Sequence, residues 1–307
     1  MKIVFMGTPD YAAVTLQKLI DENYDVAAVF AQPDKAVGRK QILTAPATKV
    51  LAEKFNIPVY QPNTLRDGTA FEILKEIDPD AIVVVAYGKI LPKEILDLPR
   101  LGCINGHASL LPELRGSAPI QWAVINGEKQ TGVTTMLMDE GVDTGDILET
   151  AVTDIGADET AEELFERLAD ISANLMISTL KKAEAGLLKP VKQDEAKATY
   201  APIIKKEMAH IDFNKTAKEI CDAVRGFYYW PCAFCFINGK RLKVIKAEVS
   251  NLKSSECGVV IKSEGSLVIS CKDGSVELVT VQPEGSKVMS AKVMLNGNKI
   301  ACGTVAE

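Results

Sequence analysis

Short apolar runs and amphipathic stretches alternate through the first two thirds of the chain. The runs at residues 2–7, 26–31 and 81–86 carry apolar side chains at consecutive positions, which is typical of strands buried on both faces of a parallel sheet. Helical periodicity lies between such runs, and it predicts helices at 11–21, 46–55, 71–77 and 159–185. Further strands are predicted at 58–60, 102–107, 131–138 and 147–152. This alternation predicts an α/β domain with a mostly parallel sheet covered by helices on both sides.

The last third of the chain has a different pattern. A stretch rich in lysine, proline and other polar residues at 190–206 is typical of a linker, and one helix is predicted after it at 215–227. Short apolar runs then follow, separated by Asn-Gly at 238–239, Asp-Gly at 273–274 and Asn-Gly at 296–297. These dipeptides are strong hairpin signals, so the pattern predicts a small all-β barrel of the OB type at 207–307.

Composition agrees with two globular domains. The chain has 307 residues, of which 47% are hydrophobic and 25% charged. No apolar run approaches the roughly 20 residues of a membrane helix, and Gly7, Pro9 and Asp10 end the first run before it could form an export signal. We therefore expect no membrane span, a cytoplasmic location and reduced cysteines. The single CxxC at Cys232 and Cys235 is interpreted as packed strand residues, since structural zinc requires four ligands.

Charge is divided unequally along the chain. The net charge of −6 argues against a nucleic-acid partner, but residues 204–307 hold 15 Lys+Arg and 11 Asp+Glu, a net charge of +4 that leaves −10 for residues 1–203. Within the acidic part, a polar loop predicted at 32–40 carries Lys35, Arg39 and Lys40 around Gly38. This loop could contact phosphates, and the alternative is an ordinary solvated loop.

One of only two histidines follows a predicted strand at a position suited to chemistry. Asn105 and His107 stand two residues apart, so their side chains project from the same face of the strand. An amide donor beside an imidazole suits the stabilisation of an oxyanion together with proton transfer. The alternative is a histidine that caps the strand end and has only a structural role.

An acidic loop at 139–146 could supply a carboxylate to His107. Its glycines allow sharp turns, and one aspartate could orient the imidazole as the third member of a triad does. A divalent-cation site is disfavoured because the spacing lacks the calcium-loop pattern, and turn-forming aspartates remain an alternative. After the first strand, residues 6–9 lack the G-x-G-x-x-G fingerprint, which disfavours a nicotinamide cofactor.

Taken together, these segments resemble the folate-dependent formyltransferases over nearly the whole chain. The segments that carry the resemblance are 105–112 (NGHASLLP), 115–121 (RGSAPIQ), 142–146 (VDTGD), 7–10 (GTPD), 32–34 (QPD) with 38–39 (GR), 86–88 (AYG), 198–201 (ATYA) and 230–231 (WP). The resemblance implies a Rossmann-like formyltransferase domain at 1–189, a linker at 190–206 and an OB-like tRNA-binding domain at 207–307. It also implies transfer of the formyl group of 10-formyltetrahydrofolate to the α-amine of methionine esterified to initiator tRNA, with no metal and no nicotinamide.

The resemblance also assigns roles to single residues. Asn105, His107 and Asp143 match the catalytic trio of the family, and either His107 or Asp143 would relay the amine proton. The expected folate contacts are Ser109, Leu110, Leu111, Pro112, Tyr87 and Gly88. The expected tRNA contacts are Lys35, Arg39 and Lys40 in the first domain and Lys205, Lys206 and Arg241 in the second, with Arg225, Lys240 and Lys243 as further candidates. Nothing indicates a membrane or an obligate protein partner.

Two positions depart from the family pattern. Gly106 stands where the family usually has a β-branched residue, and glycine weakens a strand. Glu113 and Leu114 follow Pro112 where the family often has a basic and then an aromatic residue, which argues against a phosphate contact there. Two rival functions remain at this point: formylation of an amino-sugar nucleotide, and a non-catalytic relative that binds RNA or folate.

Overall fold

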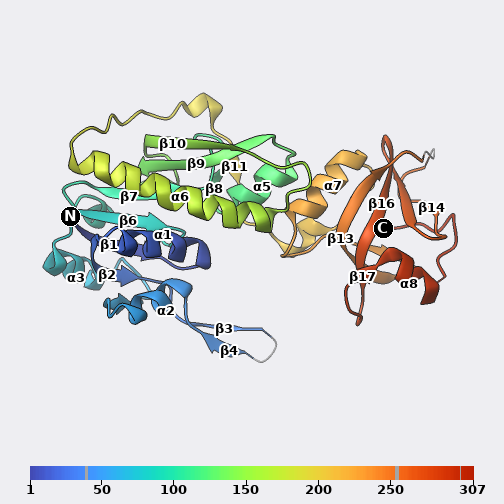
Figure 1. Ribbon diagram of the computed structural model, residues 1–307, viewed down its shortest axis with the longest axis horizontal. Coiled ribbons are helices and arrows are strands. Elements are labelled where there is room, and N and C mark those ends of the chain that lie inside the picture. The colour runs from blue at the N-terminus through green and yellow to red at the C-terminus, as the bar shows by residue number, and fades with distance from the viewer. Residues whose placement is uncertain (39–40, 253–255, 298) are drawn as a thin grey trace. The chain divides into compact units, whose positions relative to one another are not determined.

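The first sheet has seven strands in the order β10-β9-β7-β6-β1-β2-β5 (Figure 1). Their bounds are Lys2–Gly7 (β1), Asp25–Phe30 (β2), Val59–Tyr60 (β5), Ala81–Val85 (β6), Cys103–His107 (β7), Gln130–Leu137 (β9) and Asp146–Asp154 (β10). The computed structural model describes residues 1–38, 41–252, 256–297 and 299–307. The five strands from β7 to β5 pair in parallel, and β9 pairs antiparallel to β7. The predicted, mostly parallel α/β sheet is therefore confirmed.

The four helices predicted from periodicity are confirmed, at 10–21, 47–54, 69–77 and 161–184. Together with two shorter helices, their bounds are Asp10–Asp21 (α1), Ala47–Lys54 (α2), Thr69–Ile77 (α3), Lys93–Leu96 (α4), Pro119–Ile125 (α5) and Ala161–Glu184 (α6). In α1, Pro9 occupies the N-cap position and the buried face consists of Tyr11, Ala12, Thr15, Leu16 and Leu19. These positions repeat every three to four residues, so the helix is stabilised mainly by the apolar stripe that it buries.

Strand β6 shows why the sheet is covered on both faces. All five of its residues, Ala81–Val85, are buried, and one face of β6 contributes Ile82 and Val84 to a cluster that also includes Phe30 and Tyr87. A strand with apolar side chains at every position can bury all of them only between two layers of helices. The continuous Val/Ile run is therefore the sequence counterpart of a central strand.

The strand order reverses direction around β1. The chain adds β2 and β5 on one side of β1 and β6 and β7 on the other. Connections therefore diverge at the carboxyl ends of β1 and β6, and a crevice at such a switch point is the usual ligand site of an open α/β sheet. The Gln32 amide crosses this point and donates to the carbonyls of Tyr87, at 3.0 Å, and Gly88, at 3.2 Å.

The C-terminal sheet is antiparallel, in the order β12-β13-β16-β15-β14 with β17 paired to β16. Its elements are Phe234–Ile237 (β12), Lys240–Ser250 (β13), Val260–Lys262 (β14), Leu267–Cys271 (β15), Gly274–Pro283 (β16), Met289–Ser290 (β17) and the helices Ala217–Gly226 (α7) and Ala291–Gly297 (α8). The first two predicted hairpins are confirmed: Asn238 and Gly239, with φ of +52° and +70°, join β12 to β13, and Gly274 pairs with Cys271 across the next turn.

Two local predictions were wrong. The third Asn-Gly, at 296–297, ends helix α8 and forms no hairpin, because Ala291, Met294 and Leu295 bury apolar side chains at helical spacing. The segment predicted as a polar loop contains β3 (Lys35–Val37), which pairs antiparallel with β4 (Ile42–Thr44). Arg39 and Lys40 lie outside the described residues.

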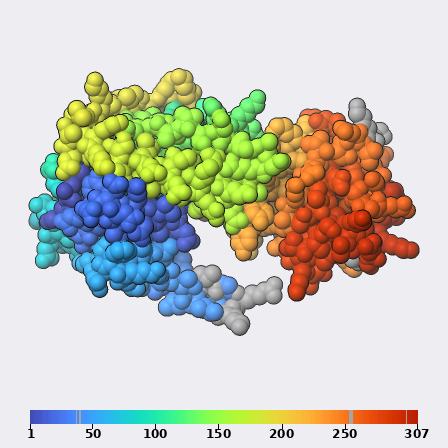
Figure 2. All heavy atoms as spheres, in the orientation of Figure 1, coloured from blue at the N-terminus to red at the C-terminus, as the bar shows by residue number. Residues whose placement is uncertain are grey.

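The chain divides into two compact units that are interleaved in sequence. The first contains 1–119, 131–154 and 165–201, and the second contains 120–130, 155–164 and 202–307. Much of the segment predicted as a linker therefore belongs to the first unit. There Val191 bridges to Ile147 of β10. Strand β11 (Tyr200–Ala201) pairs with β8 (Arg115–Gly116) (Figure 1). In Figure 2 the yellow spheres of this segment lie against the green spheres of the first unit. The boundaries predicted at 189 and 207 stay predictions. None of the described helices is long and apolar enough to cross a membrane.

Candidate active site

Strand β7 presents Asn105 and His107 on one face at its carboxyl end. Both residues are held in register by β9, where Asn105 pairs with Met136 and His107 with Thr134. His107 is 7% exposed and Asn105 is half-buried. Within the described part of the chain, no residue hydrogen bonds to the Asn105 side chain. Its amide is therefore available to a ligand.

The His107 ring lies between two acceptors. Nε2 is 3.0 Å from the Leu114 carbonyl oxygen, which can only accept, so the hydrogen lies on Nε2 in this contact. Nδ1 faces Oδ2 of Asp143 at 3.7 Å. Because the Nε2 edge is occupied, the edge shared with Asp143 is the one that can exchange a proton.

Asp143 and Asp139 divide the work of the acidic loop. Asp139 builds the turn, since its Oδ1 accepts from the backbone nitrogen of Gly141 at 3.0 Å and from the Thr144 hydroxyl at 2.6 Å. Asp143 instead directs its carboxylate toward His107, and its Oδ2 accepts from the backbone nitrogen of Gly116 at 2.8 Å. The loop therefore contains both a turn-forming aspartate and the carboxylate expected beside the imidazole.

Three non-glycine residues around the site have left-handed backbone conformations. Ala86, Leu114 and Asp143 have φ of +46°, +56° and +55°. Each such residue costs on the order of 1–3 kcal/mol and persists only where its surroundings hold it in place. All three lie around the candidate site at the carboxyl ends of β6 and β7, where surrounding contacts must hold them in place.

The segment 109–112, expected to contact folate, forms a tight turn after β7. The Ser109 hydroxyl donates to the Glu113 carbonyl at 2.6 Å, and Thr134 bridges the turn by donating to the Ser109 carbonyl at 2.7 Å while accepting from the Leu111 nitrogen at 3.2 Å. Leu111 is buried, whereas Leu110 and Pro112 are half-buried. The turn is thus rigid and presents a largely apolar surface.

Tyr87 and Gly88, the other expected folate contacts, lie at this edge of the sheet with their main chains bonded to Gln32. The Tyr87 side chain is 2% exposed within the apolar core, and this burial raises the pKa of its hydroxyl to about 12. Their carbonyls are held by Gln32, as described above, and Gly88 has φ of +78°. The motif therefore contributes main chain to this edge of the sheet, while the tyrosine hydroxyl stays in the core.

Sequence reasoning missed a polar network behind Asp143. Arg115 is 1% exposed, and its guanidinium donates to both carboxylate oxygens of Glu195, at 2.7 and 3.0 Å, and to Oε1 of Gln193. The hydrogen bond with Glu195 raises the pKa of Arg115 and lowers the pKa of Glu195. Arg115 lies in a segment that carries the family resemblance, but no pattern in the predicted linker signals its two partners.

The expected tRNA contacts lie at separate places in each unit. Lys35 is exposed on β3, and the base of this hairpin is held by Lys49, which donates to Asp34 at 2.9 Å and to Gln61 at 2.9 Å. In the second unit, Lys205 and Lys206 are exposed. Arg241 is half-buried, with its guanidinium 3.7 Å from the centre of the Phe234 ring.

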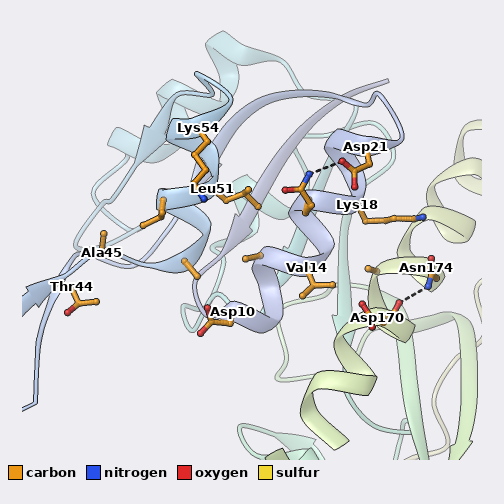
Figure 3. Close-up of a pocket in the computed structure, with 15 residues that line it drawn as sticks. Asp10, Val14, Lys18, Asp21, Thr44, Ala45, Leu51, Lys54, Asp170 and Asn174 are labelled. Atoms are coloured by element: carbon orange, nitrogen blue, oxygen red, sulfur yellow. Dashed lines mark hydrogen bonds between the residues drawn. The ribbon is translucent and has the colours of Figure 1, made fainter. Parts of the chain in front are cut away.

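A cavity of about 890 Å³ lies away from these residues, between α1, α2 and α6 (Figure 3). Val14 and Leu51 contribute to its apolar wall, while Asp10, Lys18 and Asp170 supply charged groups. None of the residues predicted to act in the site lines this cavity. It brings together no nucleophile, base and orienting group, so its lining supports no catalytic assignment.

Cysteines and potential metal ligands are not clustered. Cys232 and Cys235 are both buried, and burial raises the pKa of Cys235 to about 12. Cys235 is a packed strand residue as predicted, whereas Cys232 precedes β12 and lies in no strand. In the ranges that the structure describes, no three His, Cys, Asp or Glu side chains are grouped as a metal site.

Comparisons with known proteins identify the family of the chain. Residues 1–180 match the family described as Formyl transferase, and residues 203–299 match its C-terminal domain. A methionyl-tRNA formyltransferase of Caldanaerobacter subterraneus is 47% identical over 99% of both chains. The solved structure of a methionyl-tRNA formyltransferase from Clostridium thermocellum has 26% identity, covers 84% of this chain and 96% of its own, and gives a TM-score of 0.58. A sugar 3N-formyl transferase solved with dTDP and 5-N-formyl-THF has 23% identity, covers 94% and 99%, and gives a TM-score of 0.68, which shows a shared fold. The chain belongs to the methionyl-tRNA formyltransferase family of formyl transferases.

Proposed function

We propose that this chain transfers the formyl group of 10-formyltetrahydrofolate to the α-amine of methionine carried by initiator tRNA. One observation carries the proposal: Asn105, His107 and Asp143 converge at the end of β7 in a chain that is 47% identical, over its whole length, to a methionyl-tRNA formyltransferase. The convergence supplies the chemistry, and the full-length relationship supplies the acceptor.

The roles of the three residues follow from their chemistry. Attack of the amine on the formyl carbonyl forms the new C–N bond and places negative charge on the carbonyl oxygen, to which the free amide of Asn105 is suited to donate. The carbonyl then re-forms as the bond to N10 breaks, and tetrahydrofolate leaves with the proton that the amine has given up. The amine must lose a proton, and the His107–Asp143 edge can receive it because Nε2 is already engaged with Leu114. Asp143 then stabilises the positively charged ring.

The formyl donor is proposed to bind at the edge of the sheet beside these residues. The turn at Ser109–Pro112 offers a largely apolar surface, and the strained Ala86 lies before the main chain of Tyr87 and Gly88. Such an edge is suited to a flat heterocycle that packs against side chains and bonds to backbone groups. 10-Formyltetrahydrofolate supplies the formyl group when bound.

The tRNA would be held at few places. The exposed Lys35 on β3 and the exposed Lys205 and Lys206 are candidate phosphate contacts, because cationic side chains contact the backbone without reading the bases. Arg39 and Lys40 are proposed to act beside Lys35 on sequence grounds. The cytoplasmic location expected from the sequence stays a prediction.

The decisive experiment compares acceptors. The purified chain is incubated with 10-formyltetrahydrofolate and either initiator methionyl-tRNA, elongator methionyl-tRNA or an amino-sugar nucleotide, and the formylated product is measured. We expect formylation of the initiator methionyl-tRNA. Formylation of the amino-sugar nucleotide alone would show that the chain is a sugar formyltransferase, and binding of tRNA or folate without turnover would identify a non-catalytic relative.

A further inference from the structure

Gln193 bridges two carbonyl groups of the loop that carries Asp143. Its side-chain nitrogen donates to the carbonyl of Asp143 at 2.8 Å and to the carbonyl of Gly145 at 2.7 Å. Both amide hydrogens are therefore used within one short loop. Gln193 lies 50 residues from Asp143 in sequence but in the same compact unit.

Arg115 determines which way the Gln193 amide faces. The guanidinium donates to Oε1 of Gln193 through Nε at 3.1 Å and Nη2 at 2.9 Å. Arginine has donors only, so it can accept no bond from the amide nitrogen, which must then point at the loop. Glu195 accepts from Nη1 and Nη2 of the guanidinium, so the buried charge is paired.

Strand β8, which carries Arg115, also holds the Asp143 carboxylate. Gly116, the neighbour of Arg115, donates its backbone nitrogen to Oδ2 of Asp143 at 2.8 Å. Asp143 is therefore held at its carbonyl by Gln193 and at its carboxylate by Gly116. Its φ of +55° is costly without such support, so loss of one restraint would let the carboxylate move away from His107.

We propose that Gln193 is a positioning residue, which holds Asp143 beside His107 and is itself oriented by Arg115. The inference rests on the proposed function, because it concerns the role of Asp143 in formyl transfer. Gln193 acts through the loop and contacts no reacting atom. Small displacements of catalytic groups lower turnover more than binding, so its loss is expected to affect kcat and to spare KM.

The test compares Gln193→Ala and Gln193→Glu with the unsubstituted chain in formyl transfer to methionyl-tRNA. Glutamate keeps a partner for Arg115 but cannot donate to the two carbonyls. We expect kcat to fall by about 10- to 100-fold in both variants, with both KM values within about twofold. Gln282→Ala is the matched control, since Gln282 also donates to a backbone carbonyl, that of Ser286, and lies outside the site.

A double variant tests whether Gln193 acts through Asp143. In an Asp143→Asn chain, adding Gln193→Ala should lower kcat by less than about twofold further, because residues that act as a unit are not additive. A full further loss in that background would overturn the inference, as would normal kcat in Gln193→Glu. Equal thermal midpoints for the Gln193→Glu and unsubstituted chains exclude unfolding as the cause. Absence of transfer by the unsubstituted chain would overturn the proposed function and this inference with it.

Discussion

At the scale of single residues, the hydrogen bonds within the site leave one edge of the His107 ring and the amide of Asn105 available to a ligand. The Nε2 of His107 is bound to the Leu114 carbonyl, and its Nδ1 edge faces Asp143. Asn105 projects from the same face with its amide unengaged among the described residues. Substitutions that remove these available atoms are expected to lower formyl transfer without unfolding the chain.

Asn105→Ala and His107→Ala test whether the two side chains act in formyl transfer. Removal of the oxyanion donor Asn105 costs about 2.7–4 kcal/mol of transition-state stabilisation, so kcat for formyl transfer should fall by about 10²- to 10³-fold. Removal of the proton acceptor His107 should lower kcat by about 10²- to 10⁴-fold. Affinity for methionyl-tRNA, measured by fluorescence titration, should stay within about twofold. Turnover at the unsubstituted rate would remove these residues from the catalytic assignment.

Gly106 tests the space between these two residues. A Cβ built there would lie 3.0 Å from the Ser172 hydroxyl and 3.4 Å from Cε of Met176, so α6 fills the position that the family usually gives to a β-branched side chain. Gly106→Val should lower the free energy of unfolding by about 1–3 kcal/mol through overpacking. Urea denaturation measures this, with Gly106→Ala as the smaller control. Equal stability of the valine variant would show that α6 yields easily.

At the scale of elements, the sheet edge at β10 is tied to α6 by charge. Glu149 on β10 accepts from the Thr179 hydroxyl at 2.8 Å and pairs with Lys182, both on α6. Burial acts to raise the pKa of Glu149, but the bonds from Lys182, Thr179 and Ser178 outweigh it, and the pKa is lowered from 4.5. The ionised carboxylate therefore stabilises the folded state.

Glu149→Gln should remove this contribution in a pH-dependent way. Because the folded-state pKa is depressed, the stabilisation is present above pH 4.5 and is lost as the pH falls through the lower folded value. We expect the variant to be less stable by about 1 kcal/mol at pH 7, with the difference shrinking below pH 4.5. Urea denaturation at pH 7 and at a pH below 4.5 measures the difference in the free energy of unfolding. A difference that does not change with pH would contradict a lowered pKa of Glu149.

At the scale of the whole molecule, charge is concentrated by position and its sum is a poor guide. The net charge of −6 conceals +4 in residues 204–307 and an exposed Lys35 within the acidic part. Affinity for a tRNA depends on the phosphates that cations neutralise locally, and each such contact adds a defined salt dependence. A net negative charge is thus compatible with a tRNA substrate.

Lys35→Ala should weaken the use of methionyl-tRNA and reduce its salt dependence. Loss of one phosphate contact lowers the slope of log affinity against log salt by about 0.7–0.9. Titrations between roughly 50 and 200 mM salt give this slope. Lys75→Ala, an exposed lysine on α3, is the control and should leave it unchanged. An unchanged slope for Lys35→Ala would exclude Lys35 from the tRNA contact.

The sequence by itself determined the elements and the chemical groups. Apolar runs such as 81–86 specify buried strands, and Asn-Gly at 238–239 specifies a turn, because these effects act between neighbours in the chain. The same reasoning failed at Asn296–Gly297, where burial of Met294 and Leu295 in a helix outweighed the turn preference. The spacing of Asn105 and His107 also predicted that both lie on one face of one strand. Their catalytic roles come from the family resemblance and stay a prediction.

Only the tertiary structure decided which distant segments support those groups. Gln193 reaches Asp143 across 50 residues and Arg115 across 78, and neither contact has a local pattern that would reveal it. No local pattern shows that residues 120–130 and 155–164 belong to the second unit either. Local periodicity specifies which face of an element is buried. The identity of its partner depends on long-range packing, which the folded chain alone resolves.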